Sequence, residues 1–144
     1  MANPGGSSSE LISTRPIELS FTLPKAPGTR VYLQIITRTT SIIVFLTTRG
    51  DHDSHSLSSL GSFVYALPDR LNPGQSISTP LCINEPTLEF TTRLAKILSR
   101  KLHKPVYVGG SASFAYAGGG TVEEEVEGFK RIVEIVMSQI NKED

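Results

Sequence analysis

Apolar and polar residues alternate with a period of two in the first half of the chain, which is the pattern of β-strands with one buried face. In residues 17–23 polar side chains separate Ile17, Leu19, Phe21 and Leu23. Four further strands are predicted at residues 31–37, 41–48, 60–67 and 76–83. Residues 41–48 are apolar without alternation, so we expect this strand at the centre of the sheet with both faces covered. The last strand is short and polar, which favours a peripheral position.

The apolar spacing changes to that of a helix from Thr87 onward. Its apolar stripe consists of Phe90, Leu94, Ile97, Leu98 and Leu102, and either Asn84 or Thr87 can supply the oxygen that caps its first turn. A short strand at 106–108 and a loop of small residues from Gly109 to Gly120 follow. Thr121 and Glu124 have the spacing of a capping box, which predicts a second helix at 122–140.

This order of five strands, a helix, a strand and a helix predicts an α+β domain. Because short turns join the first strands, we expect an antiparallel six-stranded sheet. Two helices leave part of such a sheet uncovered, so we expect the chain to dimerise through it. Residues 1–15 are small and polar, which predicts a flexible N-terminal tail ahead of a single domain at 16–142.

Charge and composition narrow the class of protein. The 144 residues hold fourteen Lys and Arg against fourteen Asp and Glu, and this zero net charge argues against a nucleic-acid partner. No segment reaches the length of a membrane span, and the N-terminus lacks the apolar core of a signal peptide. Cys82 is the single cysteine, which excludes an intrachain disulfide. We therefore expect a cytoplasmic protein, with the nucleus left open as a second location.

No pattern of residues points firmly to catalysis. Asp51, His52, Asp53 and His55 lie in a Ser-rich loop at 49–59, for which we expect no metal binding because nothing rigid fixes their geometry. A glycine loop before a helix can bind phosphate, but the glutamates that follow Gly120 would repel a phosphate there. We expect neither an enzyme nor a cofactor. The alternative is a small-molecule-binding or hydrolytic domain that uses the loop from Gly109 to Gly120 with Cys82 or His103.

The first helix carries a basic face. Arg93, Lys96 and Arg100 recur at helical spacing on the side away from the apolar stripe. Exposed cations contribute little to folding, so these residues are candidates for docking an acidic protein surface.

Residues 92–108 (Thr-Arg-Leu-Ala-Lys-Ile-Leu-Ser-Arg-Lys-Leu-His-Lys-Pro-Val-Tyr-Val) resemble the helix-to-strand signature of the proteasome assembly chaperone 4 family. The order of the other elements is similar over about residues 17–140. The resemblance implies a non-catalytic chaperone that forms a heterodimer with a homologous assembly chaperone, with a homodimer of the isolated chain left open. It also implies that the pair promotes assembly of the α-type subunits into the ring of the proteasome core particle and leaves before the particle matures.

Overall fold

The computed structural model describes residues 15–23, 26–50, 60–112 and 122–143. In chain order the elements are β1 (Ile17–Leu23), β2 (Ala26–Thr37), β3 (Ile42–Gly50), β4 (Ser62–Pro68), β5 (Ser76–Cys82), α2 (Glu85–Leu102), β6 (Val106–Ser111) and α3 (Val122–Glu143). The predicted N-terminal tail, the candidate metal ligands Asp51 to His55 and the capping residue Thr121 lie outside the described residues.

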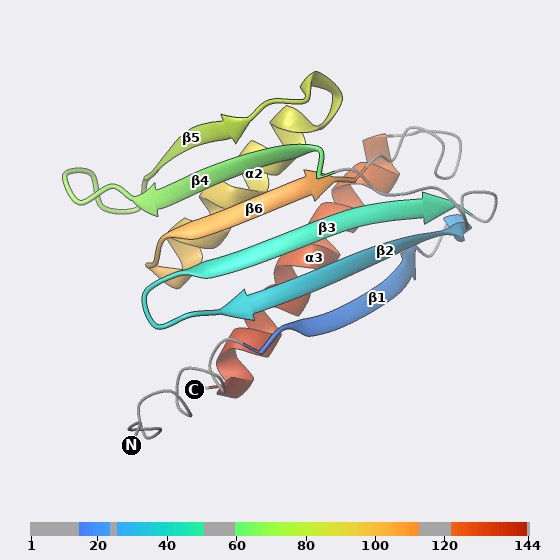
Figure 1. The fold of residues 1–144 in the computed structure, drawn as a ribbon, viewed down its shortest axis with the longest axis horizontal. Coiled ribbons are helices and arrows are strands. Elements are labelled where there is room, and N and C mark those ends of the chain that lie inside the picture. Colours follow the sequence, from blue (N-terminus) through green and yellow to red (C-terminus); the bar gives the residue numbers. More distant parts are fainter. Residues whose placement is uncertain (1–14, 24–25, 51–59, 113–121, 144) are drawn as a thin grey trace, which may run out of the picture.

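The six strands form one sheet in the order β1-β2-β3-β6-β4-β5 (Figure 1). The prediction of an entirely antiparallel sheet is wrong, because β3 and β6 are parallel. Short turns do give antiparallel pairs in β1-β2-β3 and in β4-β5, but the connection that leads to β6 contains α2. A helix-length connection lets a strand return in either direction, and β6 inserts between β3 and β4.

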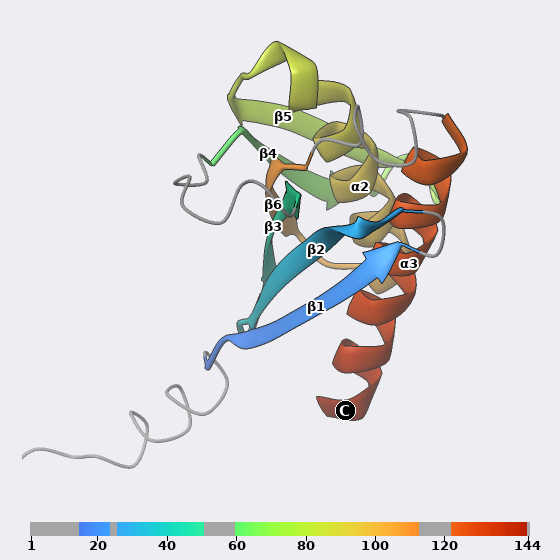
Figure 2. The same cartoon turned by 90° about the vertical axis from the view of Figure 1, so that its right-hand side faces the viewer.

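Both helices pack on the same face of the sheet (Figure 2). α2 lies behind β4, β5 and β6, and α3 lies behind β1 and β2. The core between these layers is aliphatic, and its fully buried centre includes Ile35, Val44, Val64, Leu94, Val108 and Ile132. Predicted strand 41–48 is central, as expected, but only Ile42, Val44 and Leu46 are buried, while Ile43 and Phe45 on the other face remain half-exposed.

Two strands extend at least three residues beyond their predicted bounds. β2 begins at Ala26 although the strand was predicted from residue 31, and β6 continues through Gly109 and Gly110 to Ser111, which were predicted as loop. Small residues fit this part of β6 because it is crowded. A Cβ on Gly110 would overlap the hydroxyl of Thr91, and one on Gly109 would lie 2.7 Å from both Phe45 Cδ1 and Leu60 Cδ1.

α2 begins differently from the prediction. Asn84 is the N-cap residue, but its side chain makes no capping hydrogen bond. Its backbone is instead held by the start of β4, because Ser62 Oγ accepts a 2.9 Å hydrogen bond from Asn84 N. Thr87 Oγ1 accepts from Ser62 N at 3.1 Å. These bonds anchor α2 to β4. At its other end α2 stops at His103, whose N–H donates a last helical hydrogen bond to Ser99 O and whose left-handed backbone (φ 55°) turns the following chain out of the helix.

Candidate protein-binding face of the sheet

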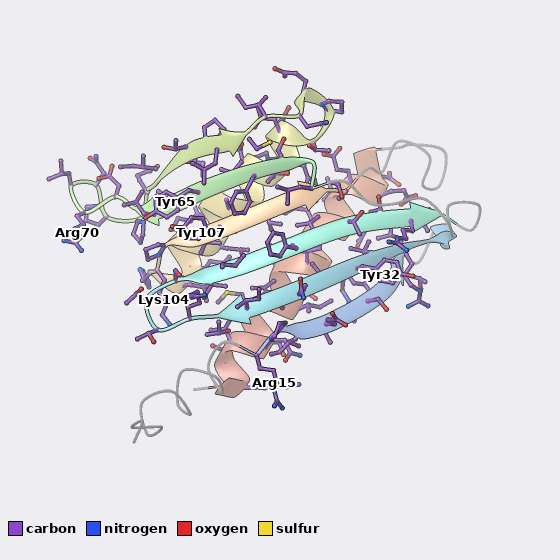
Figure 3. The ribbon with its side chains drawn as sticks, in the orientation of Figure 1. Arg15, Tyr32, Tyr65, Arg70, Lys104 and Tyr107 are labelled. Carbon is purple, nitrogen blue, oxygen red and sulfur yellow. The ribbon has the colours of Figure 1, made fainter. Side chains whose placement is uncertain are left out.

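The face of the sheet opposite the helices carries a row of aromatic rings. In β3, β4 and β6 the aromatic residues that alternate with the buried ones are Phe45, Phe63, Tyr65 and Tyr107, all of them half-buried. Tyr65 and Tyr107 are cross-strand partners with ring centroids 4.7 Å apart, and Phe63 stacks on Tyr107 at 5.9 Å. Tyr65 and Tyr107 lie side by side on this face in Figure 3. We call this surface, including Ile77 of β5, the open face.

Gly109 lets this row of rings continue across three strands. It is the cross-strand partner of both Phe45 in β3 and Phe63 in β4. With no side chain between them, the two phenyl rings stack at 6.1 Å and 9° over the glycine. Leu60, which is 45% exposed, contacts the same position from the segment before β4. The result is an apolar surface over the central strands of the sheet.

The open face becomes polar toward β1 and β2. An open groove of about 630 Å³ lies there, lined by Glu18, Tyr32, Gln34, Thr47, Arg49 and Ser111 together with the edge of Phe45 and Leu60. The guanidinium of Arg49 lies 5.6 Å from the ring centroid of Tyr32, a cation–π geometry. An apolar centre flanked by a polar margin is the composition of a protein–protein interface.

Within the described residues, no group of three or more His, Cys, Asp or Glu side chains is placed to hold a metal ion. Cys82 ends β5 beside the start of α2, whereas His103 lies just past the end of that helix. At 1.5 Å per residue the 18 residues of α2 separate them by about 27 Å, so they cannot act on one substrate. Gly109 and Gly110 of the alternative ligand loop belong to β6, and residues 113–120 lie outside the described residues.

Arg93, Lys96 and Arg100 lie in α2, and we call them the α2 basic patch. The patch has the orientation that the sequence predicts. Phe90, Leu94 and Leu98 are buried, while Lys96 and Arg100 are exposed on the opposite side of the helix. Neither cation forms an ion pair with another residue that the structure describes.

Arg93 differs from the other two members of the patch. Its guanidinium lies 5.6 Å from the ring centroid of Phe129 in α3 and 3.9 Å from a carboxylate oxygen of Glu89. Phe129 in turn meets Phe90 edge-on, with ring centroids 5.4 Å apart. Arg93 therefore contributes to the contact between the two helices, a role that its spacing in the sequence does not reveal.

No helix among the described residues combines the length and the apolar character needed to cross a membrane.

A mixed sheet covered by helices on one side and presenting aromatic rings on the other defines an α+β domain with an apolar face of the kind found in protein-binding surfaces. The chain belongs to the proteasome assembly chaperone 4 family, whose family model matches residues 30–111. Its role is in proteasome assembly.

The fold is also found in a solved structure. A chain in the crystal structure of a novel chaperone complex for yeast 20S proteasome assembly superposes with a TM-score of 0.60, at 16% sequence identity, over 91% of this chain and 98% of that chain. At this identity the likeness concerns the fold. A search of curated protein sequences returned no match.

Proposed function

We propose that the chain pairs with a homologous assembly chaperone through the open face, and that the pair promotes formation of the ring of α-type proteasome subunits. The observation that carries this proposal is the aromatic row of Phe45, Phe63, Tyr65 and Tyr107, which has no helix over it among the described residues. Family membership and the occurrence of this fold in a yeast chaperone complex support the same function.

Binding alone accounts for this activity, so the proposal includes neither a catalytic group nor a cofactor. The chain leaves before the core particle matures, and it acts in the cytoplasm. Transient complexes are smaller and more polar than permanent ones, which suits a client contact made by charged residues. A longer-lived pair of chaperones instead suits a contact made by the apolar open face.

The experiment is to tag the chain at its natural abundance and to separate the proteasome species that contain it on native gels. We expect the tag in species that hold α-type subunits, together with one similarly folded chaperone in equal amount, and not in the mature core particle. Equal labelling of mature particles would overturn the release step. Absence of α-type subunits from every tagged species would overturn the function itself.

Within this proposal the α2 basic patch contacts the client through Lys96 and Arg100. The double variant Lys96→Glu/Arg100→Glu is expected to keep the melting temperature of the wild type, because exposed cations without partners contribute less than about 1 kcal/mol. Its association with α-type subunits should be slower at low salt and indistinguishable from wild type at high salt, measured by stopped-flow fluorescence.

A matched control reverses the same number of charges on α3, as Lys130→Glu/Arg131→Glu, and should associate at the wild-type rate. Equal slowing in both variants would show that only total charge matters.

Arg93→Ala is expected to behave differently, with a loss of about 0.5–1 kcal/mol of stability, because it removes the cation–π contact with Phe129.

A further inference from the structure

One end of the sheet gathers cations from segments far apart in the sequence. Arg15 precedes β1, Arg38 follows β2, Lys104 precedes β6 and Arg70 follows β4. The strand register places all four at the same end of the sheet. The start of β1 pairs near the end of β2, the end of β2 pairs with the start of β3, and the start of β3 pairs with the start of β6, which in turn pairs near the end of β4. Figure 3 shows Arg15, Lys104 and Arg70 spread along this end. We call these four residues the strand-end patch.

The charges of this patch are not neutralised locally. None of the four cations forms an ion pair within the described part of the chain. In the turns at this end Asp69 is the one acidic residue that the structure describes, and its carboxylate accepts hydrogen bonds of 2.9 Å from Leu71 N and from Asn72 Nδ2. The bond from Asn72 and then the bond from Leu71 lower the pKa of Asp69, so it carries a single negative charge beside four positive ones.

The end of the strands opposite the patch carries charges of both signs, because Arg30 and Arg49 face each other there as cross-strand partners. At the opposite end α2 begins next to Ser62 with Glu85 and Glu89 in its first turns. α3 begins at that end as well (Figure 1), with three consecutive glutamates in its first turn, Glu123, Glu124 and Glu125. A partner with acidic groups would be attracted to the strand-end patch, whereas at the opposite end the glutamates offset the cations Arg30 and Arg49.

We propose that the strand-end patch is a docking site for an extended acidic segment of a protein partner. β1 and β4 are four strand spacings apart in the sheet, which is about 19 Å at 4.8 Å per spacing. An extended chain covers that distance with about six residues at about 3.3 Å each. The occupant is thus a short run of Asp and Glu that crosses the ends of the strands. This contact is separate from the pairing through the open face.

A protein segment fits the patch better than a nucleic acid does. Nucleic-acid affinity rests on releasing many counterions, and a basic excess over the whole domain normally supplies it. This chain has no such excess, and its glutamates at the other end would repel a long phosphate backbone. A run of six acidic residues needs only the length of the patch and avoids that end.

The test uses the full chain and a fluorescein-labelled hexaglutamate peptide, with fluorescence anisotropy at low salt as the readout. Arg38→Glu/Arg70→Glu is expected to bind the peptide at least tenfold more weakly than wild type, and Lys130→Glu/Arg131→Glu on α3 to bind it as wild type does. Arg38 and Arg70 are exposed turn residues, so their variant should keep the wild-type melting temperature, and the α3 variant should lose only the exposed ion pair of Arg131 with Glu134, with a small decrease in melting temperature. Arg38→Gln/Arg70→Gln should give an intermediate affinity.

Three results would overturn the proposal. One is equal weakening in the strand-end and α3 variants, which would reflect net charge alone. Another is tighter binding of a hexathymidylate oligonucleotide that competes with the peptide, which would make this a nucleic-acid site. The third is reversible self-association of the wild-type chain at low salt that the strand-end variant loses, since the occupant would then be the glutamates of a second copy. None of these results bears on pairing through the open face. That pairing is measured separately, as binding of the partner chaperone at high salt.

Discussion

Replacing Phe63 by aspartate is expected to remove binding to the partner chaperone while the domain stays folded. Phe63 lies in the middle of the aromatic row, between Phe45 at 6.1 Å and Tyr107 at 5.9 Å. Aromatic residues at the centre of an interface are the usual binding hot spots, and losing one costs about 2 kcal/mol or more, at least about thirtyfold in Kd. A carboxylate at this position would also be buried against apolar surface without a partner, which raises the cost further.

The folded domain should tolerate this change. Phe63 is half-buried, and it loses two ring contacts worth about 0.5–1.5 kcal/mol each, against a stability of about 5–15 kcal/mol for a domain of this kind. The measurement is the Kd for the partner chaperone by calorimetry, with the melting temperature recorded for every variant.

Leu71→Asp is the control for the Phe63 variant. Leu71 is 90% exposed in the turn between β4 and β5, so it tests the loss of an exposed apolar group outside the aromatic row. It should bind the partner as tightly as wild type does. Undiminished binding by a folded Phe63→Asp protein would exclude the open face as the pairing surface.

Replacing Gly61 by alanine is expected to give the largest loss of stability of any single methyl added to this domain. Gly61 has a φ of +73°, which an L side chain rarely adopts, and its Cβ would overlap the carbonyl oxygen of Gly110 in β6. The neighbouring Ser62 is fixed by its hydrogen bonds to Asn84 and Thr87, so the backbone has little freedom to retreat. We expect a loss of at least about 3 kcal/mol, as for overpacking combined with backbone strain.

Gly74→Ala provides a matched control, since it separates strain from overlap. Gly74 has a similar φ of +87° in an exposed turn, and no atom lies within 4 Å of where its Cβ would be. Its substitution should cost only the left-handed strain, about 1–2 kcal/mol. Urea unfolding of both variants measures the difference. Equal losses at the two glycines would mean that β4 and β6 separate easily at this point.

The sequence predicts the individual elements of the fold better than their arrangement. The pattern of apolar residues is a local signal, and it identifies β1, β3 and β4 to within a few residues, by period-two alternation in β1 and by an unbroken apolar run in β3. The position of β6 between β3 and β4 depends on contacts between distant segments, which no local pattern records. Gly109, Gly110 and Ser111 read as loop because small residues carry no periodicity. In the sheet they are small because Phe45, Leu60 and Thr91 occupy the space.

The candidate sites show the same division between local and distant information. Lys96 and Arg100 belong to one helix, so helical spacing alone places them on its exposed side. The rings of Phe45, Phe63 and Tyr107 come from three strands, and they meet only once the strand order and register are known. The sequence did contain a signal for this aromatic surface. Each ring alternates with buried aliphatic residues, so each of these strands has two apolar faces. The same limit applies to the strand-end patch, whose members are separated by up to 89 positions in the chain, between Arg15 and Lys104.

The place of β6 also determines when the protein can fold during its own synthesis. β1-β2-β3 and β4-β5 are built from local pairings and can form as soon as they leave the ribosome, but β6 is the strand that joins them, and it is translated after α2. Until residue 111 has emerged, the inner edges of β3 and β4 have no partner, and such edges are prone to pair with other chains. A protein that guides the assembly of others thus depends, for much of its own synthesis, on its nascent strands remaining protected.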